Sequence, residues 1–186
     1  MLAQRLSDQR VLSLDIDSLA ASPALRDHFA TTLLSVGSIL HHADRRSIVW
    51  GSGLQSQGVL PREKPAGVVA VRGPLTARAL SAAGMGTCHV FGDPAILLPT
   101  LLRRPPQSNA VQPNNPGRLG IIPHISDVDS PHLDRLSRST NVRIIDIRQS
   151  ILGFLDDLWQ CDYIASSSLH GLIAADAYGI PSTWVE

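Results

Sequence analysis

The stretch "CDYIASSSLHGLIAADAYGIPSTW" (residues 161–184) decides the predicted fold, because it holds a strand, a helix and a second strand in succession. The short apolar run "DYIAS" predicts a strand, "LHGLIAADAYG" predicts a helix, and "PSTWV" predicts the next strand. Strand–helix–strand units of this length are typical of parallel sheets that carry helices on both faces. Three serines and a histidine lie where the helix begins.

The same alternation recurs on both sides of a proline- and asparagine-rich segment. Further strands are predicted at "SIVW", "VVAVRG", "CHVF", "RLGIIPH" and "NVRIIDI", and further helices at "PLTARALSAAG", "SPHLDRLSRS" and "SILGFLDDLWQ". Gly84 is the expected C-cap of the first of these helices. We therefore predict an α/β protein with two Rossmann-like lobes, residues 1–100 and 118–186, joined by a linker over residues 101–117.

Apolar periodicity supports two of the predicted helices. Leu25, Phe29 and Leu33 recur at four-residue spacing after Ser22-Pro23, which indicates a helix entering at that point. In the helix over residues 151–160, six apolar side chains are expected to form one face, with Asp156, Asp157 and Gln160 opposite. The six are Ile151, Leu152, Phe154, Leu155, Leu158 and Trp159.

Composition excludes several classes of function. Sixteen Lys and Arg balance sixteen Asp and Glu in 186 residues, so no overall field attracts nucleic acid. Cys88 and Cys161 are far apart and fit reduced thiols of a cytoplasmic protein. No apolar run has the length of a signal peptide or a membrane span. His41 and His42 adjoin and do not suit one metal ion, so we expect neither metal nor cofactor.

Polar residues gather after the predicted strands, at the edge where ligands bind in open α/β sheets. Glycine-rich or charged turns follow three strands of the first lobe, and His124 and the serine–histidine junction follow two strands of the second. The candidate site residues are Gly51, Ser52, Gly53, Arg72, Asp93, His124, Ser166, Ser167, Ser168, Leu169 and His170. Turns of this kind are often polar for structural reasons alone, and Asp93 before Pro94 also fits a turn former.

Arg72 and the serine–histidine junction both suggest an anion. Arg72 precedes a helix that begins at Pro74, and a cation is unfavourable at that end of a helix unless an anion lies between them. Three serine hydroxyls and free backbone N–H groups would make a cradle for phosphate or carboxylate, beside His170 in the first helical turn. The alternatives are an Arg72 that reaches solvent or pairs with a carboxylate, and a His170 with a structural role.

Five motifs together resemble the polysaccharide pyruvyl transferase family. "SIVWGSGL", "VRGPLTARAL", "GDPAILLP", "IIPH" and "CDYIASSSLHGLIAADAYGIPS" occur in the family's order and at similar separations, from about Gly37 to the C-terminus. The resemblance implies two Rossmann-like lobes similar to the GT-B glycosyltransferases, with an active site between them. It also implies transfer of pyruvate from phosphoenolpyruvate to a sugar, commonly as a cyclic ketal, in bacterial exopolysaccharide biosynthesis.

The resemblance gives the candidate residues roles. Arg72 would bind the carboxylate or phosphate of phosphoenolpyruvate, and the Ser166–Ser168 turn would bind its phosphate. His170 would bind the donor or transfer a proton, with His124 a second candidate on the opposite wall. The acceptor would be a glycan or a lipid-linked oligosaccharide, which implies a cytoplasmic enzyme associated with the inner face of the membrane through its acceptor.

Two departures from the family pattern keep alternatives open. Members often have Arg-Leu-His where this chain has Ser168-Leu169-His170, and they usually begin with an Asn-x-Gly-Asp-like loop and continue beyond Glu186. The resemblance therefore implies a chain shortened at both ends. A catalytically silent remnant or binding module of the same fold, or a GT-B-type glycosyltransferase or sugar-nucleotide epimerase, remain the alternatives.

Overall fold

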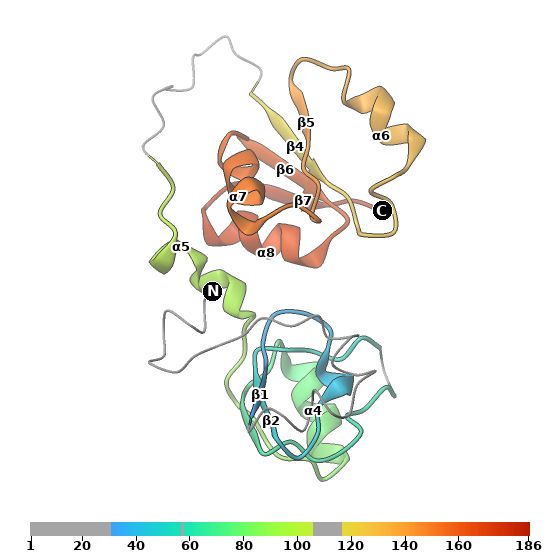
Figure 1. The fold of residues 1–186 in the computed structure, drawn as a ribbon, viewed down its shortest axis with the longest axis vertical. Coiled ribbons are helices and arrows are strands. Elements are labelled where there is room, and N and C mark those ends of the chain that lie inside the picture. The colour runs from blue at the N-terminus through green and yellow to red at the C-terminus, as the bar shows by residue number, and fades with distance from the viewer. Residues whose placement is uncertain (1–30, 57, 106–116) are drawn as a thin grey trace. The chain divides into compact units, whose positions relative to one another are not determined.

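The fold is that of a computed structural model, which describes residues 31–56, 58–105 and 117–186. The chain divides into two compact units, Met1–Pro94 and Ala95–Glu186. Each unit contains a parallel sheet with helices packed on it, which confirms the predicted α/β class with two Rossmann-like sheets (Figure 1). The division after Pro94 comes earlier in the chain than the expected lobe end at residue 100, and most of the expected linker lies outside the described residues.

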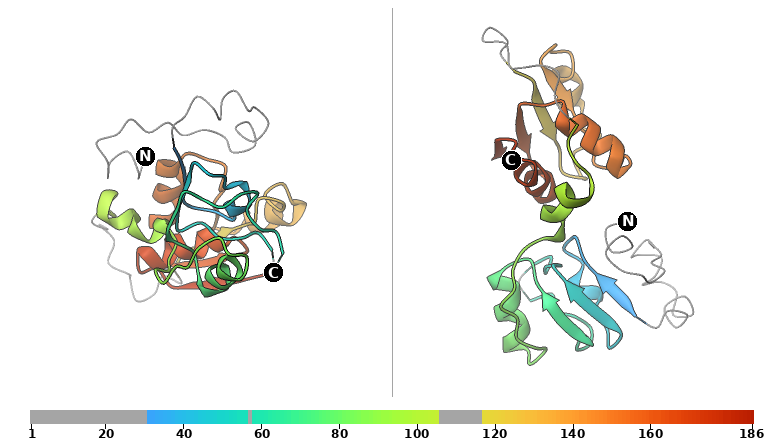
Figure 2. Two further views of the ribbon diagram at one scale, coloured as in Figure 1. Left: turned by 90° about the horizontal axis from the view of Figure 1, so that it is seen from below. Right: turned by 90° about the vertical axis from the view of Figure 1, so that its left-hand side faces the viewer.

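The first unit is built on three parallel strands in the order β1 (Thr32–Leu34), β2 (Ser47–Trp50) and β3 (Gly67–Ala70). Figure 2 shows these strands side by side with α4 (Pro74–Ala82) next to them. Helix α4 begins with proline at its first position, where a missing N–H costs nothing. It is followed by Gly84 with φ of 68°, which confirms the predicted glycine at the helix end.

The core of the first unit lies on one side of this sheet. The 3₁₀ turn η1 (Leu40–His42) and helix α4 supply apolar side chains that pack against the strands. The buried cluster comprises Leu34, Leu40, Ala43, Val49, Val71, Ala77, Leu80 and Cys88. Val69 of β3 points away from this cluster and is 58% exposed. The sheet of this unit therefore has one covered and one open face within the described residues.

Two predictions for the first unit are wrong. The helix expected to run through Leu33 is strand β1 at Thr32–Leu34, because these residues pair in parallel with Ser47–Val49 of β2; the rest of that prediction falls on residues 22–30, outside the described part. The strand expected at "CHVF" is reduced to a bridge between Val71 and Phe91. Only the hydrogen bonds from Val71 N to Val90 O and from Gly92 N to Val71 O remain of a fourth strand.

The second unit has four parallel strands in the order β5 (Val142–Ile144), β4 (Leu119–Ile122), β6 (Tyr163–Ser166) and β7 (Ser182–Trp184). All four were predicted near these positions. The chain steps one way across the sheet from β4 to β5 and the opposite way from β5 to β6. Right-handed crossovers then place α6 (Pro131–Leu136) on one face, and α7 (Ile151–Trp159) and α8 (Leu169–Ala177) on the other.

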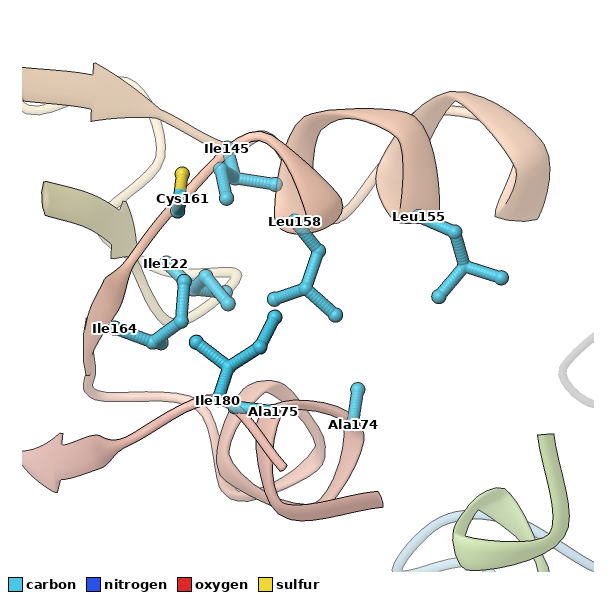
Figure 3. Close-up of a cluster of buried hydrophobic side chains, with 9 residues drawn as sticks. All are labelled: Ile122, Ile145, Leu155, Leu158, Cys161, Ile164, Ala174, Ala175 and Ile180. Carbon is cyan, nitrogen blue, oxygen red and sulfur yellow. The ribbon is translucent and has the colours of Figure 1, made fainter. Parts of the chain in front are cut away.

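The core of the second unit lies between the sheet and helices α7 and α8 (Figure 3). Strands contribute Ile122 and Ile164, and the helices contribute leucines and alanines. The full buried cluster is Ile122, Ile145, Leu155, Leu158, Cys161, Ile164, Ala174, Ala175 and Ile180. Helix α6 contributes no buried residue. Helix α8 meets the sheet through small side chains, so its backbone lies close to β4 and β6.

The apolar face of α7 is narrower than predicted. Leu155 and Leu158 are buried, and Phe154 and Trp159 pack partly against the core. Ile151 and Leu152, in the first turn, are instead 38% and 50% exposed. The predicted six-residue face is therefore wrong at its first two members. The Ser150 hydroxyl accepts from the Gly153 amide at 3.1 Å and caps the helix.

Residues 95–105 pack on the second unit, which explains why the chain divides after Pro94. The segment holds all of η2 (Pro94–Leu97) except Pro94, and α5 (Leu98–Leu101). Leu98 and Leu102 contact the core, and the Tyr178 hydroxyl donates to the Leu102 carbonyl at 2.7 Å. The Arg104 guanidinium donates to the Trp159 carbonyl at 2.8 Å. This segment belongs to the second unit through both apolar and polar contacts.

Candidate functional site

The candidate residues of each unit lie at the carboxyl ends of its parallel strands. In the first unit they follow β2, β3 and the Val71–Phe91 bridge. In the second unit they follow β4 and β6, which are neighbours in the sheet. Since this edge is where ligands bind in open α/β sheets, each unit brings its own candidates together. Whether residues of the two units bind one ligand stays a prediction.

Arg72 is fixed by neutral groups in the first unit. Its guanidinium donates to the Ser38 hydroxyl at 2.7 Å and to the Leu54 carbonyl at 3.0 Å. Among residues 31–56, 58–105 and 117–186, no carboxylate forms an ion pair with Arg72. The alternative in which Arg72 pairs with a carboxylate is therefore wrong within this part of the chain. A half-buried cation keeps N–H donors beyond the two that these contacts use.

The Gly51–Gly53 turn holds Arg72 in position. A Cβ on Gly53 would lie 2.5 Å from the Arg72 Cζ atom, so the guanidinium packs directly over this glycine. Ser52 is fully buried, and its hydroxyl donates to the Gly37 carbonyl at 3.0 Å. Gly51 has φ of 91° and lies against Pro94. Gly51, Ser52 and Gly53 therefore hold Arg72 in place. The expectation that Ser52 itself binds a ligand is wrong, because its side chain is buried.

The end of helix α4 near Arg72 is open to an anion. Its N-cap is Gly73, which has no side chain to accept from the first N–H groups, and its first turn holds no acidic residue. The helix dipole and Arg72 thus place positive charge at one end of the sheet. Asp93 follows the Val71–Phe91 bridge and is 5% exposed, in agreement with its alternative role as a buried turn residue.

Ser166 is part of the fold and not of an anion cradle. It is fully buried, and its hydroxyl lies 3.0 Å from the Ile122 carbonyl and 2.9 Å from the Ser168 carbonyl. The same oxygen accepts from the Ser168 amide at 3.0 Å. A hydroxyl has one proton, and these partners use it fully. The expectation that three hydroxyls face a ligand is therefore wrong at Ser166.

Ser167 joins the serine turn to His124. Its hydroxyl oxygen accepts from the backbone amide of His124 at 2.8 Å, and its own amide donates to the Ile122 carbonyl at 3.1 Å. The loops after β4 and β6 are thereby tied together. His124 lies beside Ser167 on the same sheet edge, and not on a wall opposite to it as expected. Its side chain is exposed and accessible to a ligand.

The N-terminus of α8 is the second place suited to an anion. Ser168 is its N-cap, yet the Ser168 side chain forms no capping hydrogen bond. Leu169 is 41% exposed and His170 is half-buried in the first turn. A Cβ on Gly171 would lie 2.5 Å from the Ser166 hydroxyl oxygen and 2.9 Å from Ile122 Cγ2. Gly171 therefore allows α8 to begin directly over the ends of β4 and β6.

Several polar residues at the same edges escaped the sequence analysis. Ser38 holds Arg72, and Ser126 and Asp127 lie next to His124. Arg148, after β5, binds Asp129 and Asp146, and the bound guanidinium lowers the pKa of the Asp146 carboxyl. The signal that could have found Ser126, Asp127, Asp129 and Arg148 is their position within five residues after a predicted strand. Ser38 gave no such signal, because it follows β1, where the sequence predicted a helix.

The described residues contain neither a cluster of metal-binding side chains nor a membrane-spanning helix. No group of three or more His, Cys, Asp or Glu side chains there could hold a metal ion. No helix of this part of the chain is long and apolar enough to cross a membrane. His41 and His42 stack on each other with ring centroids 3.9 Å apart.

Comparison with known proteins identifies the family. The profile of the polysaccharide pyruvyl transferase family matches residues 22–186, which is most of the chain. The chain belongs to the polysaccharide pyruvyl transferase family. This confirms the resemblance carried by the five motifs.

Two curated relatives are much longer than this chain. An uncharacterised protein of Acanthamoeba polyphaga mimivirus is 30% identical over 99% of this chain and 60% of its own length. The succinoglycan biosynthesis protein ExoV of Rhizobium meliloti is 28% identical over 88% of this chain and 51% of its own length. The chain thus spans about half to three-fifths of these relatives. No solved structure matches it.

Proposed function

We propose that the protein transfers pyruvate from phosphoenolpyruvate to a sugar of a polysaccharide or lipid-linked oligosaccharide, and forms a pyruvate ketal. Membership of the pyruvyl transferase family supports the transferred group and the glycan acceptor. The similarity to a succinoglycan biosynthesis protein supports an exopolysaccharide pathway. Phosphoenolpyruvate as donor and the ketal as product are the parts that remain to be tested.

The observation that carries the donor proposal is the state of Arg72. Its guanidinium is half-buried, held by the neutral Ser38 and Leu54 groups, and no carboxylate of the described residues neutralises it. A partly buried cation of this kind binds an anion with charge-assisted hydrogen bonds, which are roughly twice as strong as neutral ones. Phosphoenolpyruvate supplies both a carboxylate and a phosphate for such a site.

The second unit offers a separate group suited to phosphate. The uncapped N-terminus of α8 presents backbone N–H groups at the positive end of the helix dipole, beside Ser167, Ser168 and His170. Where this chain has Ser168, family members often carry arginine, so the backbone N–H groups of the helix end would have to replace one cation. Phosphate affinity at this place would then depend more on the helix N-terminus.

The two attacking hydroxyls release two protons in the reaction, of which C3 takes one and the departing phosphate takes the other. The first sugar hydroxyl gives its proton to a base as its oxygen bonds to C2 of the enol, and C3 takes a proton, so the C2=C3 double bond becomes single. The bond from C2 to the phosphate oxygen then breaks, and phosphate leaves with its electron pair. A second sugar hydroxyl adds to C2 and loses its proton, which closes the ketal. We assign the proton transfers to His170 and His124.

The acceptor determines where in the cell we expect the protein to act. A lipid-linked oligosaccharide would bring the protein to the cytoplasmic face of the membrane through binding of the acceptor.

A catalytically silent member of the family is the second candidate function, and Ser168 in place of arginine favours it. Such a protein would bind phosphoenolpyruvate and release no phosphate.

Phosphate release and acceptor mass test the proposal together. The protein is incubated with phosphoenolpyruvate and a synthetic β-galactoside, and we expect acceptor-dependent phosphate release and one ketal per modified acceptor. Binding of phosphoenolpyruvate without phosphate release would support the silent member. A rise in melting temperature with UDP-sugars and none with phosphoenolpyruvate would favour a GT-B-type glycosyltransferase and overturn the proposal.

A further inference from the structure

The loop after β4 connects His124 to a carboxylate through one hydroxyl. His124 Nδ1 lies 2.9 Å from the Ser126 hydroxyl oxygen, and this hydroxyl lies 3.1 Å from an Asp127 carboxylate oxygen. Two backbone hydrogen bonds hold the loop that carries this row of three residues. The His124 amide donates to Ser167, and the Asp127 amide donates to the His124 carbonyl at 2.9 Å.

The hydrogen count of the row restricts the tautomer of His124. The Ser126 hydroxyl has a single proton, and it can donate to Asp127 or to Nδ1 but not to both. If it donates to Asp127, its oxygen accepts from an N–H at Nδ1, and Nε2 carries a lone pair. If it donates to Nδ1, the hydrogen of a neutral ring is on Nε2, and two oxygen lone pairs oppose each other at the carboxylate.

Charge decides between these arrangements. The first arrangement has a cost of its own, because the Ser126 amide lies 3.3 Å from Nδ1 and would face an N–H instead of the lone pair to which it donates. This contact is long, so the bond that is lost is weak. The second arrangement keeps it. In the second arrangement, the ionised Asp127 carboxylate loses its hydrogen bond from the Ser126 hydroxyl, which lies 3.1 Å away. A hydrogen bond to an ionised acceptor is roughly twice as strong as a neutral one. The first arrangement is therefore favoured.

We infer that Ser126 and Asp127 are positioning residues that hold His124 with its hydrogen on Nδ1 and its lone pair on Nε2. His124 is exposed at the ligand-binding edge of the second sheet, so Nε2 is accessible to a substrate. The catalytic role of this lone pair rests on the proposed function. In that reaction, Nε2 takes the proton of an attacking sugar hydroxyl as its oxygen bonds to C2 of phosphoenolpyruvate.

The tautomer can be measured without any turnover. In the full chain, ¹⁵N NMR of the histidine ring distinguishes a nitrogen that carries hydrogen from one that carries a lone pair. The spectra are recorded at a pH where the ring is neutral, and His124→Gln assigns the signals. We expect a hydrogen on Nδ1 in the unaltered protein, and a shift of the population toward the Nε2–H tautomer in Ser126→Ala and in Asp127→Asn.

Asp134→Asn is the matched control, because Asp134 is an exposed carboxylate on α6 outside this row of contacts. It should leave the His124 signals unchanged. The His124 amide signal, which reports the bond to Ser167, should also persist in all variants and would show that the loop still folds. A neutral His124 with its hydrogen on Nε2 in the unaltered protein would overturn the inference.

Kinetics test the use of the lone pair. We expect Ser126→Ala and Asp127→Asn to lower kcat roughly tenfold, and to change the KM for phosphoenolpyruvate by less than about twofold, since an acid–base group contributes roughly 10²–10⁴ in rate. An unchanged kcat beside a changed tautomer would overturn the positioning role. If the unaltered protein releases no phosphate, the proposed function fails, and the spectra alone decide the tautomer.

Discussion

At the scale of single residues, strand alternation separates serines that look alike in the sequence. Ser166 shares its side of β6 with the buried Ile164, and so its hydroxyl turns into the protein. Ser167 follows the end of the strand and contacts the loop of His124. The sequence allowed this distinction, because residues two apart on a strand face the same side. The partner of each hydroxyl could not be predicted, since it depends on how β4 and β6 pair.

Gly53→Ala should disturb the first unit through Arg72. The added Cβ would lie 2.5 Å from the guanidinium carbon, which must move away from Ser38 and Leu54. We expect the free energy of unfolding to fall by about 1–3 kcal/mol, measured by urea denaturation. Gly67→Ala is the control, because nothing lies within 4 Å of its Cβ position. Equal effects of the two substitutions would contradict the close packing of Arg72 on Gly53.

The Cys161 thiol should be inert in the folded protein. Burial raises the pKa of Cys161 to about 11, so the reactive thiolate is scarce at neutral pH. We expect a thiol reagent to label Cys161 at pH 8 only after urea unfolds the chain, as read by peptide mass. Rapid labelling of Cys161 without urea would show that the core of the second unit opens easily.

The same pKa shift predicts a loss of stability in alkali. An unfolded thiol loses its proton near its ordinary pKa of 9.0, whereas the folded thiol keeps its proton up to about 11. The folded state therefore binds more protons between these pH values, and the free energy of unfolding falls as pH rises through this window. Two pKa units correspond to at most about 3 kcal/mol. Cys161→Ala should remove this part of the pH dependence, and an equally steep fall in the variant would refute the assignment.

At the scale of elements, the same substitution should have opposite effects in two helices. Gly171→Ala in α8 places a Cβ 2.5 Å from the Ser166 hydroxyl and 2.9 Å from Ile122, so α8 must move off the sheet. Gly153→Ala in α7 meets the end of the Gln149 side chain at 2.8 Å and the Ser150 hydroxyl at 3.3 Å, both of which are side-chain atoms that can shift. It gains helix propensity of up to about 1 kcal/mol. We expect Gly171→Ala to lower the free energy of unfolding by about 1–3 kcal/mol.

Urea denaturation of the two variants side by side checks this pair. The α7 variant should be as stable as the unaltered protein or more stable. If both variants lose the same stability, helix α8 does not approach β4 and β6 as closely as the position of Gly171 requires.

The elements that the sequence predicted well are those with both a strong apolar run and a clear stop. Helix α4 begins at Pro74 and is followed by Gly84, and all four strands of the second sheet are short apolar runs before polar turns. The elements that failed depend on distant partners. Strand β1 exists because Thr32–Leu34 pairs with β2, and the periodic pattern through Leu33 could not show this. Near Phe91 the chain keeps two hydrogen bonds to Val71 and no full strand.

At the scale of the whole molecule, the family was accessible from the sequence because its motifs occur at strand ends in both units. The order of these motifs survives in a chain that spans 51–60% of its curated relatives. The candidate site was only partly predictable. The sequence placed Arg72, His124 and the serine turn at strand ends, but the neutral partners of Arg72 come from loops distant in the sequence.

The central claim is that Arg72 serves an anionic donor. Its most direct test is calorimetric titration of phosphoenolpyruvate into the unaltered protein, Arg72→Gln and Arg78→Gln, the last an exposed arginine of α4 used as control. A lost charged hydrogen bond costs about 1.5–3 kcal/mol, so the Kd should rise roughly tenfold to a hundredfold in Arg72→Gln and stay unchanged in Arg78→Gln. Equal affinity of the unaltered protein and Arg72→Gln would contradict the account.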